Sequence, residues 1–178
     1  MTAVNLGVTL TQVGKRVVIV DADMRKPRQH KIFKIKNESG LTNYLMSAIQ
    51  ITSVLKATQI PDLFLINAGP IPPNPSELLG SEKMADLLGH LKEKFDYVLV
   101  DTPPVLAGAD ALVLARQTDG AVLVVWGGKT PRTALQRAKQ RLDFMGIRTN
   151  GVILNRVDVK SHDYYYEHHY YYEDKPFG

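Results

Sequence analysis

The chain has 178 residues, 44% of them hydrophobic and 22% charged, which is the composition of a globular protein with one ordinary core. With no cysteine it can form neither a disulfide framework nor a thiolate metal site, and no apolar run approaches the roughly 18 residues of a membrane span. The net charge of +4 is mild and the Lys and Arg residues are scattered, so no nucleic-acid partner is expected and we predict a soluble cytoplasmic protein.

Short apolar runs alternate with longer segments of helical period along the chain. Continuous Val/Ile/Leu runs, unlike alternating ones, are typical of parallel strands that helices cover on both faces. We therefore predict an α/β fold with a mostly parallel sheet and helices on both faces. The expected elements, in chain order, are a helix over 3–13 ended by Gly14, strands over 16–23 and 63–67, a helix over 76–93 capped by Ser76 or Ser81, strands over 96–101 and 120–126, a helix over 131–145 capped by Thr130, and a strand over 151–155.

From residue 158 onward the apolar periodicity ends and Asp, Ser, His, Tyr and Glu predominate. This predicts a domain over 1–157 followed by a flexible, tyrosine-rich tail over 158–178. The tail holds six of the eight tyrosines, in YYYEHHYYY. Its histidines, two of them adjacent, seldom make a specific metal site in such a segment.

Two of the predicted strands end in aspartate: VVIVDAD reaches Asp21 and Asp23, and YVLVDTPP reaches Asp101. In a parallel sheet these carboxylates meet in one crevice at the carboxyl ends of the strands. Phosphate-transferring enzymes hold Mg²⁺ on such oxygen ligands. For either aspartate alone, a helix cap or a solvated loop residue is the more common reading; the pair together favours a shared metal site.

Three segments resemble the bacterial tyrosine kinases, P-loop proteins that control capsule and exopolysaccharide synthesis. IVDADMRKP resembles their Walker A′ motif, YVLVDTPP resembles their Walker B motif, and PPNPSELL over 72–79 is similar to a segment that division-site and partition ATPases lack. The resemblance covers nearly the whole chain. Without the resemblance, physical reasoning favours reading PPNPSELL as a stiff proline loop that introduces a helix.

The resemblance implies a kinase that uses ATP and Mg²⁺. In it, Asp21 would orient the metal and accept the tyrosine proton, Asp23 would support it, and Asp101 would hold the metal through a water. Asn155 and Arg156 would lie at the nucleotide, with the Asn155 amide against adenine; a turn-forming asparagine is the alternative. The phosphate acceptors would be the tail tyrosines Tyr164, Tyr165, Tyr166, Tyr170, Tyr171 and Tyr172.

The same resemblance implies two partners. One is the protein itself, in a ring in which the tail of one subunit enters the site of the next. The other is a membrane-spanning activator, which would place the domain at the inner face of the cell membrane.

The glycine-rich Walker A loop of these kinases is absent from the 178 residues. Gly128-Lys129-Thr130 has the right last letters but lacks the earlier glycine and follows the wrong strand. By the resemblance, residues 2–6 correspond to the helix after the loop. We therefore expect an N-terminally truncated domain that lacks the loop and its strand, and that binds ATP poorly because the acidic crevice repels phosphates.

Two other functions remain open. A positioning or partition ATPase of the same fold would cycle on a membrane or on DNA, but residues 158–178 show neither an amphipathic helix nor a basic patch. A non-catalytic phosphate acceptor for an intact kinase is favoured by the missing loop.

Overall fold

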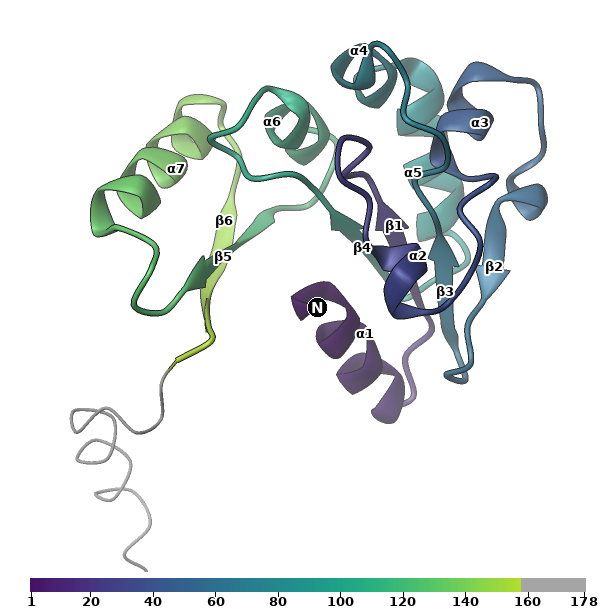
Figure 1. Cartoon of the computed structure of the whole chain (residues 1–178), viewed down its shortest axis with the longest axis horizontal. Helices are drawn as coiled ribbons and strands as arrows, with labels where there is room; N and C mark the ends of the chain where they lie inside the picture. The colour runs from purple at the N-terminus through teal and green to yellow at the C-terminus, as the bar shows by residue number, and fades with distance from the viewer. Residues whose placement is uncertain (158–178) are drawn as a thin grey trace, which may run out of the picture.

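The structure, a computed structural model, describes residues 1–157, so the predicted tyrosine tail lies outside the described residues. Its strands form two sheets (Figure 1). The larger has the order β2-β3-β1-β4, in which β1 is parallel to β3 and to β4 while β2 is antiparallel to β3. The smaller is the parallel pair β5-β6. The strands are β1 (Val17–Asp21), β2 (Leu55–Ala57), β3 (Leu63–Ile66), β4 (Tyr97–Asp101), β5 (Ala121–Trp126) and β6 (Thr149–Asn155).

The helices connect these strands; α1 and α5 pack on the larger sheet and α7 packs on β6 of the smaller one. None of them, over the described residues, is long and apolar enough to cross a membrane. They are α1 (Thr2–Gln12), α2 (Gln29–Ile32), α3 (Leu41–Met46), the short 3₁₀ helix η1 (Ile51–Ser53), α4 (Pro75–Leu79), α5 (Glu82–Lys92), α6 (Asp110–Ala115) and α7 (Arg132–Phe144).

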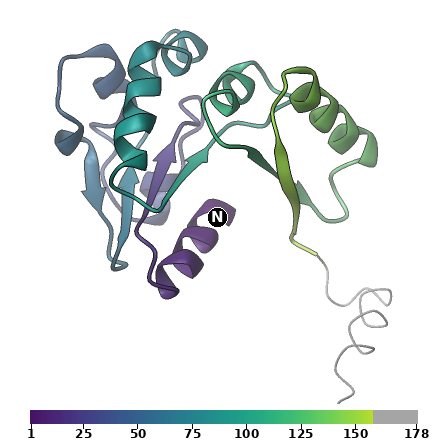
Figure 2. The same ribbon diagram turned by 180° about the vertical axis from the view of Figure 1, so that it is seen from behind.

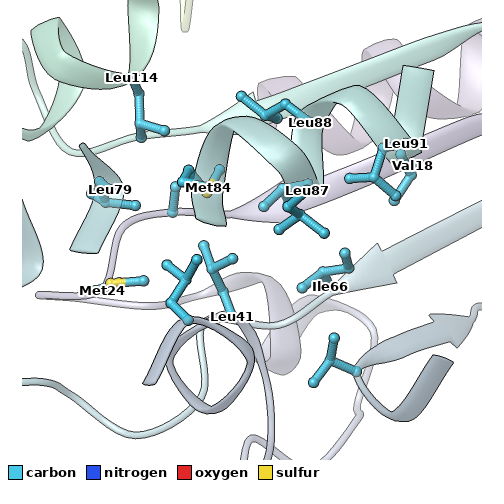
Figure 3. Close-up of a cluster of buried hydrophobic side chains, with 14 of the residues drawn as sticks. Val18, Met24, Leu41, Ile66, Leu79, Met84, Leu87, Leu88, Leu91 and Leu114 are labelled. Atoms are coloured by element: carbon cyan, nitrogen blue, oxygen red, sulfur yellow. The ribbon is translucent and has the colours of Figure 1, made fainter. Parts of the chain in front are cut away.

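Strand β1 lies inside the larger sheet, between β3 and β4, and is buried along its whole length. Val18 and Val20 face a cluster that α3, α4, α5 and α6 complete with leucines and methionines (Figure 3). Val17 and Ile19 face a second cluster, to which α1 contributes Val4. Each fully buried aliphatic side chain contributes roughly 1.5 to 3 kcal/mol, so these two layers hold β1 firmly in place. The predicted α/β fold with a mostly parallel sheet is confirmed.

Helix α1 packs directly on β1 through a glycine. A Cβ at Gly7 would lie 3.0 Å from Leu63 Cδ1 and 3.3 Å from Ile19 Cδ1, so a larger residue would require these two side chains to shift. Gly14, with a φ of +76°, ends the helical segment as expected.

The helix predicted over 76–93 is two helices, α4 and α5, separated at Gly80 and Ser81. Ser81 caps α5 by accepting a hydrogen bond from the backbone N–H of Met84, which confirms one of the two predicted caps.

The predicted cap of α7 at Thr130 is wrong. Its hydroxyl accepts the backbone N–H of Trp126, 2.9 Å away, and Pro131 precedes α7 without a side-chain cap.

Strands β5 and β6 depart from the expectation of burial on both faces. They stand apart from the larger sheet in two opposite views (Figures 1 and 2). Alternate side chains of both strands are exposed: Val122 by 45%, Val124 by 51%, Val152 by 50% and Leu154 by 58%. Among the described residues β5 pairs only with β6, and β4 pairs only with β1. One edge of each of β4 and β5 is therefore left open, and the apolar faces beside those edges are incompletely covered.

Candidate active site

The carboxyl ends of β1 and β4 bring Asp21 and Asp101 together. The two strands are parallel and in register, with Asp21 directly opposite Asp101. The register continues past the strands, since the backbone N–H of Ala22 donates to the carbonyl of Asp101 at 2.8 Å. Neighbouring residues of parallel strands point to the same face of a sheet, so the predicted shared position of these two carboxylates is confirmed in geometry.

Asp21 is fully buried. Its Oδ2 accepts the backbone N–H groups of Arg28 at 3.2 Å and Gln29 at 3.0 Å, whereas its Oδ1 has no hydrogen-bond partner among the described residues. Burial raises the pKa of Asp21 to about 6; the two N–H groups act against this rise, while the charges of Asp101 and Asp23 add to it. A buried carboxylate with one free oxygen is suited to bind a cation or a proton there.

Gln29 joins the two acids, a role that no motif or spacing in the sequence signals. Its backbone N–H donates to Asp21, and its side-chain Nε2 donates to Asp101 Oδ2 at 2.5 Å. Gln29 is the first residue of α2, a short helix that lay outside the predicted elements. Gln29 thus contacts one acid through its backbone and the other through its side chain.

Asp23, the third predicted acid, has a local role as well. Its Oδ1 accepts the backbone N–H of Lys26 at 2.9 Å and so shapes the loop that leads from β1 to α2. It lies near enough to raise the pKa of Asp21. The structure thus gathers all three predicted acids at one edge of the larger sheet.

Asn155 and Arg156, the predicted nucleotide contacts, lie on the other sheet at the end of β6. The Asn155 Nδ2 donates to Thr2 Oγ1 at 2.9 Å and so ties β6 to the start of α1. Arg156 has a φ of +54°, and its guanidinium lies 4.1 Å from the centre of the Trp126 ring. Contact of either residue with adenine stays a prediction.

The residues at the end of β1 and β4 fit a magnesium ion better than they fit a nucleotide. Mg²⁺ is held by one or two carboxylates together with waters and substrate phosphates, which matches the pair Asp21 and Asp101. The described residues contain no cluster of three or more His, Asp or Glu side chains that would form a complete metal cage. For the phosphates of ATP the fit is poor, because no glycine-rich loop is present to surround them with N–H groups.

Comparison with known proteins agrees with these motifs. The family described as AAA domain matches residues 1–125. The tyrosine-protein kinase YwqD of Bacillus subtilis is 40% identical over 164 residues, which cover 92% of this chain and 69% of that protein.

Solved structures give the same result. The kinase domain of the Escherichia coli tyrosine kinase ETK superposes with a TM-score of 0.84 at 35% identity, over 87% of this chain and 61% of that one. The septum site-determining protein MinD of Pyrococcus horikoshii, complexed with Mg-ADP, has a TM-score of 0.73 at 22% identity over 89% of this chain and 65% of that one, and so shares the fold alone. This chain therefore belongs to the family of bacterial tyrosine-protein kinases.

Proposed function

We propose that this chain is part of the catalytic domain of a protein-tyrosine kinase that transfers phosphate from ATP to tyrosines. The observation that carries the proposal is the pairing of the fully buried Asp21 with the half-buried Asp101, in which one oxygen of Asp21 has no hydrogen-bond partner among the described residues. Membership of the tyrosine kinase family supports it. ATP would supply the phosphate, and Mg²⁺ would neutralise the charge that develops on it.

Asp21 and Asp101 would hold the magnesium ion, and Asp21 would also take the proton of the attacking tyrosine. A general base works best when its pKa lies near the working pH. In the metal-free chain, burial raises the pKa of Asp21 to about 6, closer to that condition than the pKa of an exposed aspartate, and a bound magnesium ion would favour the ionised form that accepts the proton. Asp23 would support Asp21 by shaping the loop to α2.

The phosphate acceptors would be the six tail tyrosines between 164 and 172, in a neighbouring copy of the chain. Each added phosphate brings about −1.5 to −2 charges, so several on one tail would drive a ring of copies apart. We propose that this switch regulates capsular or exopolysaccharide synthesis together with a membrane-spanning activator, at the inner face of the cell membrane.

Activity needs a phosphate-binding loop that the 178 residues do not contain. We define the extended chain as this sequence preceded by a β-strand and a glycine-rich loop ending in Gly-Lys-Thr. With ATP and Mg²⁺, the extended chain should acquire phosphotyrosine within 164–172, measured by mass spectrometry of tail peptides. The 178-residue chain and an extended chain with Asp21→Asn should not. Equal phosphorylation of the extended chain and its Asp21→Asn variant would refute the proposed catalytic role.

The tyrosine cluster over 164–172 is also compatible with a second function, that of a phosphate acceptor for an intact kinase. An acceptor needs its tyrosines but not Asp21. Mixed with an active tyrosine kinase, the 178-residue chain and its Asp21→Asn variant should then be phosphorylated equally on the tail, while the extended chain incubated alone would stay unmodified.

A further inference from the structure

A second buried carboxylate, Asp110, lies outside the pair formed by Asp21 and Asp101. It is the first residue of α6 and is 1% exposed. Arg25 donates to it through two nitrogens, from Nε to Oδ2 at 2.7 Å and from Nη2 to Oδ1 at 3.2 Å. The hydroxyl of Ser76 donates to the same Oδ1. One carboxylate thus joins three segments of the chain, since Ser76 lies 34 positions and Arg25 lies 85 positions before Asp110 in the sequence.

Asp110 carries its charge because both partners are in place. The hydrogen bond from Arg25, followed by that from Ser76, holds the pKa of Asp110 below its usual range in spite of burial. Removal of the cationic partner of a buried carboxylate strongly destabilises the folded protein. Arg25, although 53% of its side chain is exposed, is therefore fixed in one orientation.

Arg25 lies in the loop that completes the environment of Asp21. This loop runs from Asp23 to Arg28. Asp23 accepts the N–H of Lys26 inside it, and at its end the N–H groups of Arg28 and Gln29 donate to Asp21. The loop is thus attached to Asp21 at one end and to Asp110 through Arg25, so displacement of Arg25 would move the two N–H groups that orient Asp21.

Ser76 connects the same carboxylate to the PPNPSELL segment, for which the catalytic proposal gives no role. Ser76 lies in the first turn of α4, which packs closely on α6. A Cβ at Gly80 would lie 3.0 Å from Val113 Cγ1, and the Gln117 side chain donates to the carbonyl of Leu79 at 2.7 Å. Helices α4 and α6 therefore form one unit, and Asp110 is its point of attachment to the loop.

We propose that Asp110 is a positioning residue that couples the PPNPSELL segment to the catalytic loop, through Ser76 on one side and Arg25 on the other. Movement of α4 is transmitted by this carboxylate to the backbone N–H groups that hold Asp21. The catalytic meaning of the coupling rests on the proposed function, but the coupling itself can be measured without ATP or turnover.

Amide hydrogen exchange of the 178-residue chain tests the coupling. In Asp110→Asn, we expect the amides of Arg28 and Gln29 to exchange at least about tenfold faster than in the unmodified chain, because a charged hydrogen bond that fixes the loop is lost. The amides of Val18 and Val20 in β1 should keep their rates. Unchanged rates at Arg28 and Gln29, or an equal increase throughout β1, would overturn the proposal.

Two further variants keep the test valid if Asp110→Asn unfolds the chain. Arg25→Lys keeps the charge on a half-exposed side chain but loses the two-nitrogen contact, so it should raise the same two rates to a smaller extent. Ser76→Ala should also raise them, although Ser76 makes no direct contact with the loop. If neither variant changes these rates, the coupling through Asp110 is absent.

Asp119→Asn serves as the matched control. It removes an aspartate from an ion pair of similar length, Lys92 to Asp119 at 2.8 Å, but this pair is exposed and includes no residue of the loop. The exchange rates of Arg28 and Gln29 should stay as in the unmodified chain.

Discussion

At the scale of single residues, Asp21 is the most informative position in the chain. It is the last residue of a strand that is buried along its whole length, so its carboxylate is removed from water, and only one of its oxygens receives hydrogen bonds. Such an arrangement costs stability, and proteins retain it where a ligand or a proton uses the free oxygen.

This cost predicts a specific pH dependence of stability in metal-free buffer. The unfolded chain ionises Asp21 near pH 4, whereas the folded chain keeps the proton up to about pH 6. The folded state therefore binds more protons between these values, and this group's contribution to the free energy of unfolding falls by roughly 2 to 3 kcal/mol as pH rises through that window.

Asp21→Asn removes the effect. Urea denaturation of both proteins from pH 4 to pH 7 should show the variant gaining stability relative to the unmodified chain by that amount as pH rises. Asp110, whose lowered pKa acts in the opposite direction at more acidic pH, is present in both proteins and cancels in the difference. A difference that does not vary with pH would contradict the raised pKa.

The three acids were predictable from sequence, because each follows an apolar run and the ends of parallel strands meet at one edge. Gln29 and Asp110 were not. Gln29 reaches Asp101 across 72 positions, and Arg25 reaches Asp110 across 85. No local spacing signals such contacts, which arise only when the chain folds.

At the scale of elements, the apolar runs predicted five of the six strands, with bounds within a few residues. The sixth, β2, has three residues and no apolar run of its own, so its pairing with β3 depends on the neighbouring strand. The prediction of a single helix over 76–93 was wrong at Gly80 and Ser81. There the glycine lies against α6 and the serine caps a new helix.

Strands β5 and β6 should be the least protected part of the described sheets. Their apolar residues are half exposed, and β5 has one unpaired edge. Amide exchange in β5 should therefore be about a hundredfold faster than in β1, which has neighbours on both sides. The same measurement on the extended chain should show slower exchange in β5, since we expect the added strand to pair between β4 and β5. Equal rates in β5 and β1 of the 178-residue chain would contradict the open edge.

At the scale of the whole molecule, the fold and the proposed site are distributed unevenly over the two sheets. The larger sheet carries Asp21 at the end of the fully buried β1, Asp101 at the end of the partly buried β4, and the loop to α2. The smaller sheet carries Asn155 and Arg156, which the Asn155 bond to Thr2 ties to α1. The proposed nucleotide site would therefore draw on residues of both sheets.

The central claim is that the Asp21 site of one copy phosphorylates the tail of another. The most direct test mixes two extended chains with ATP and Mg²⁺. One copy carries Asp21→Asn with its tail intact, and the other keeps Asp21 but has all six tail tyrosines changed to phenylalanine. Mass spectrometry should find phosphotyrosine within 164–172 of the Asp21→Asn copy, and none when both copies carry Asp21→Asn. Absence of phosphate from the mixture, or its presence when neither copy has Asp21, would contradict the account.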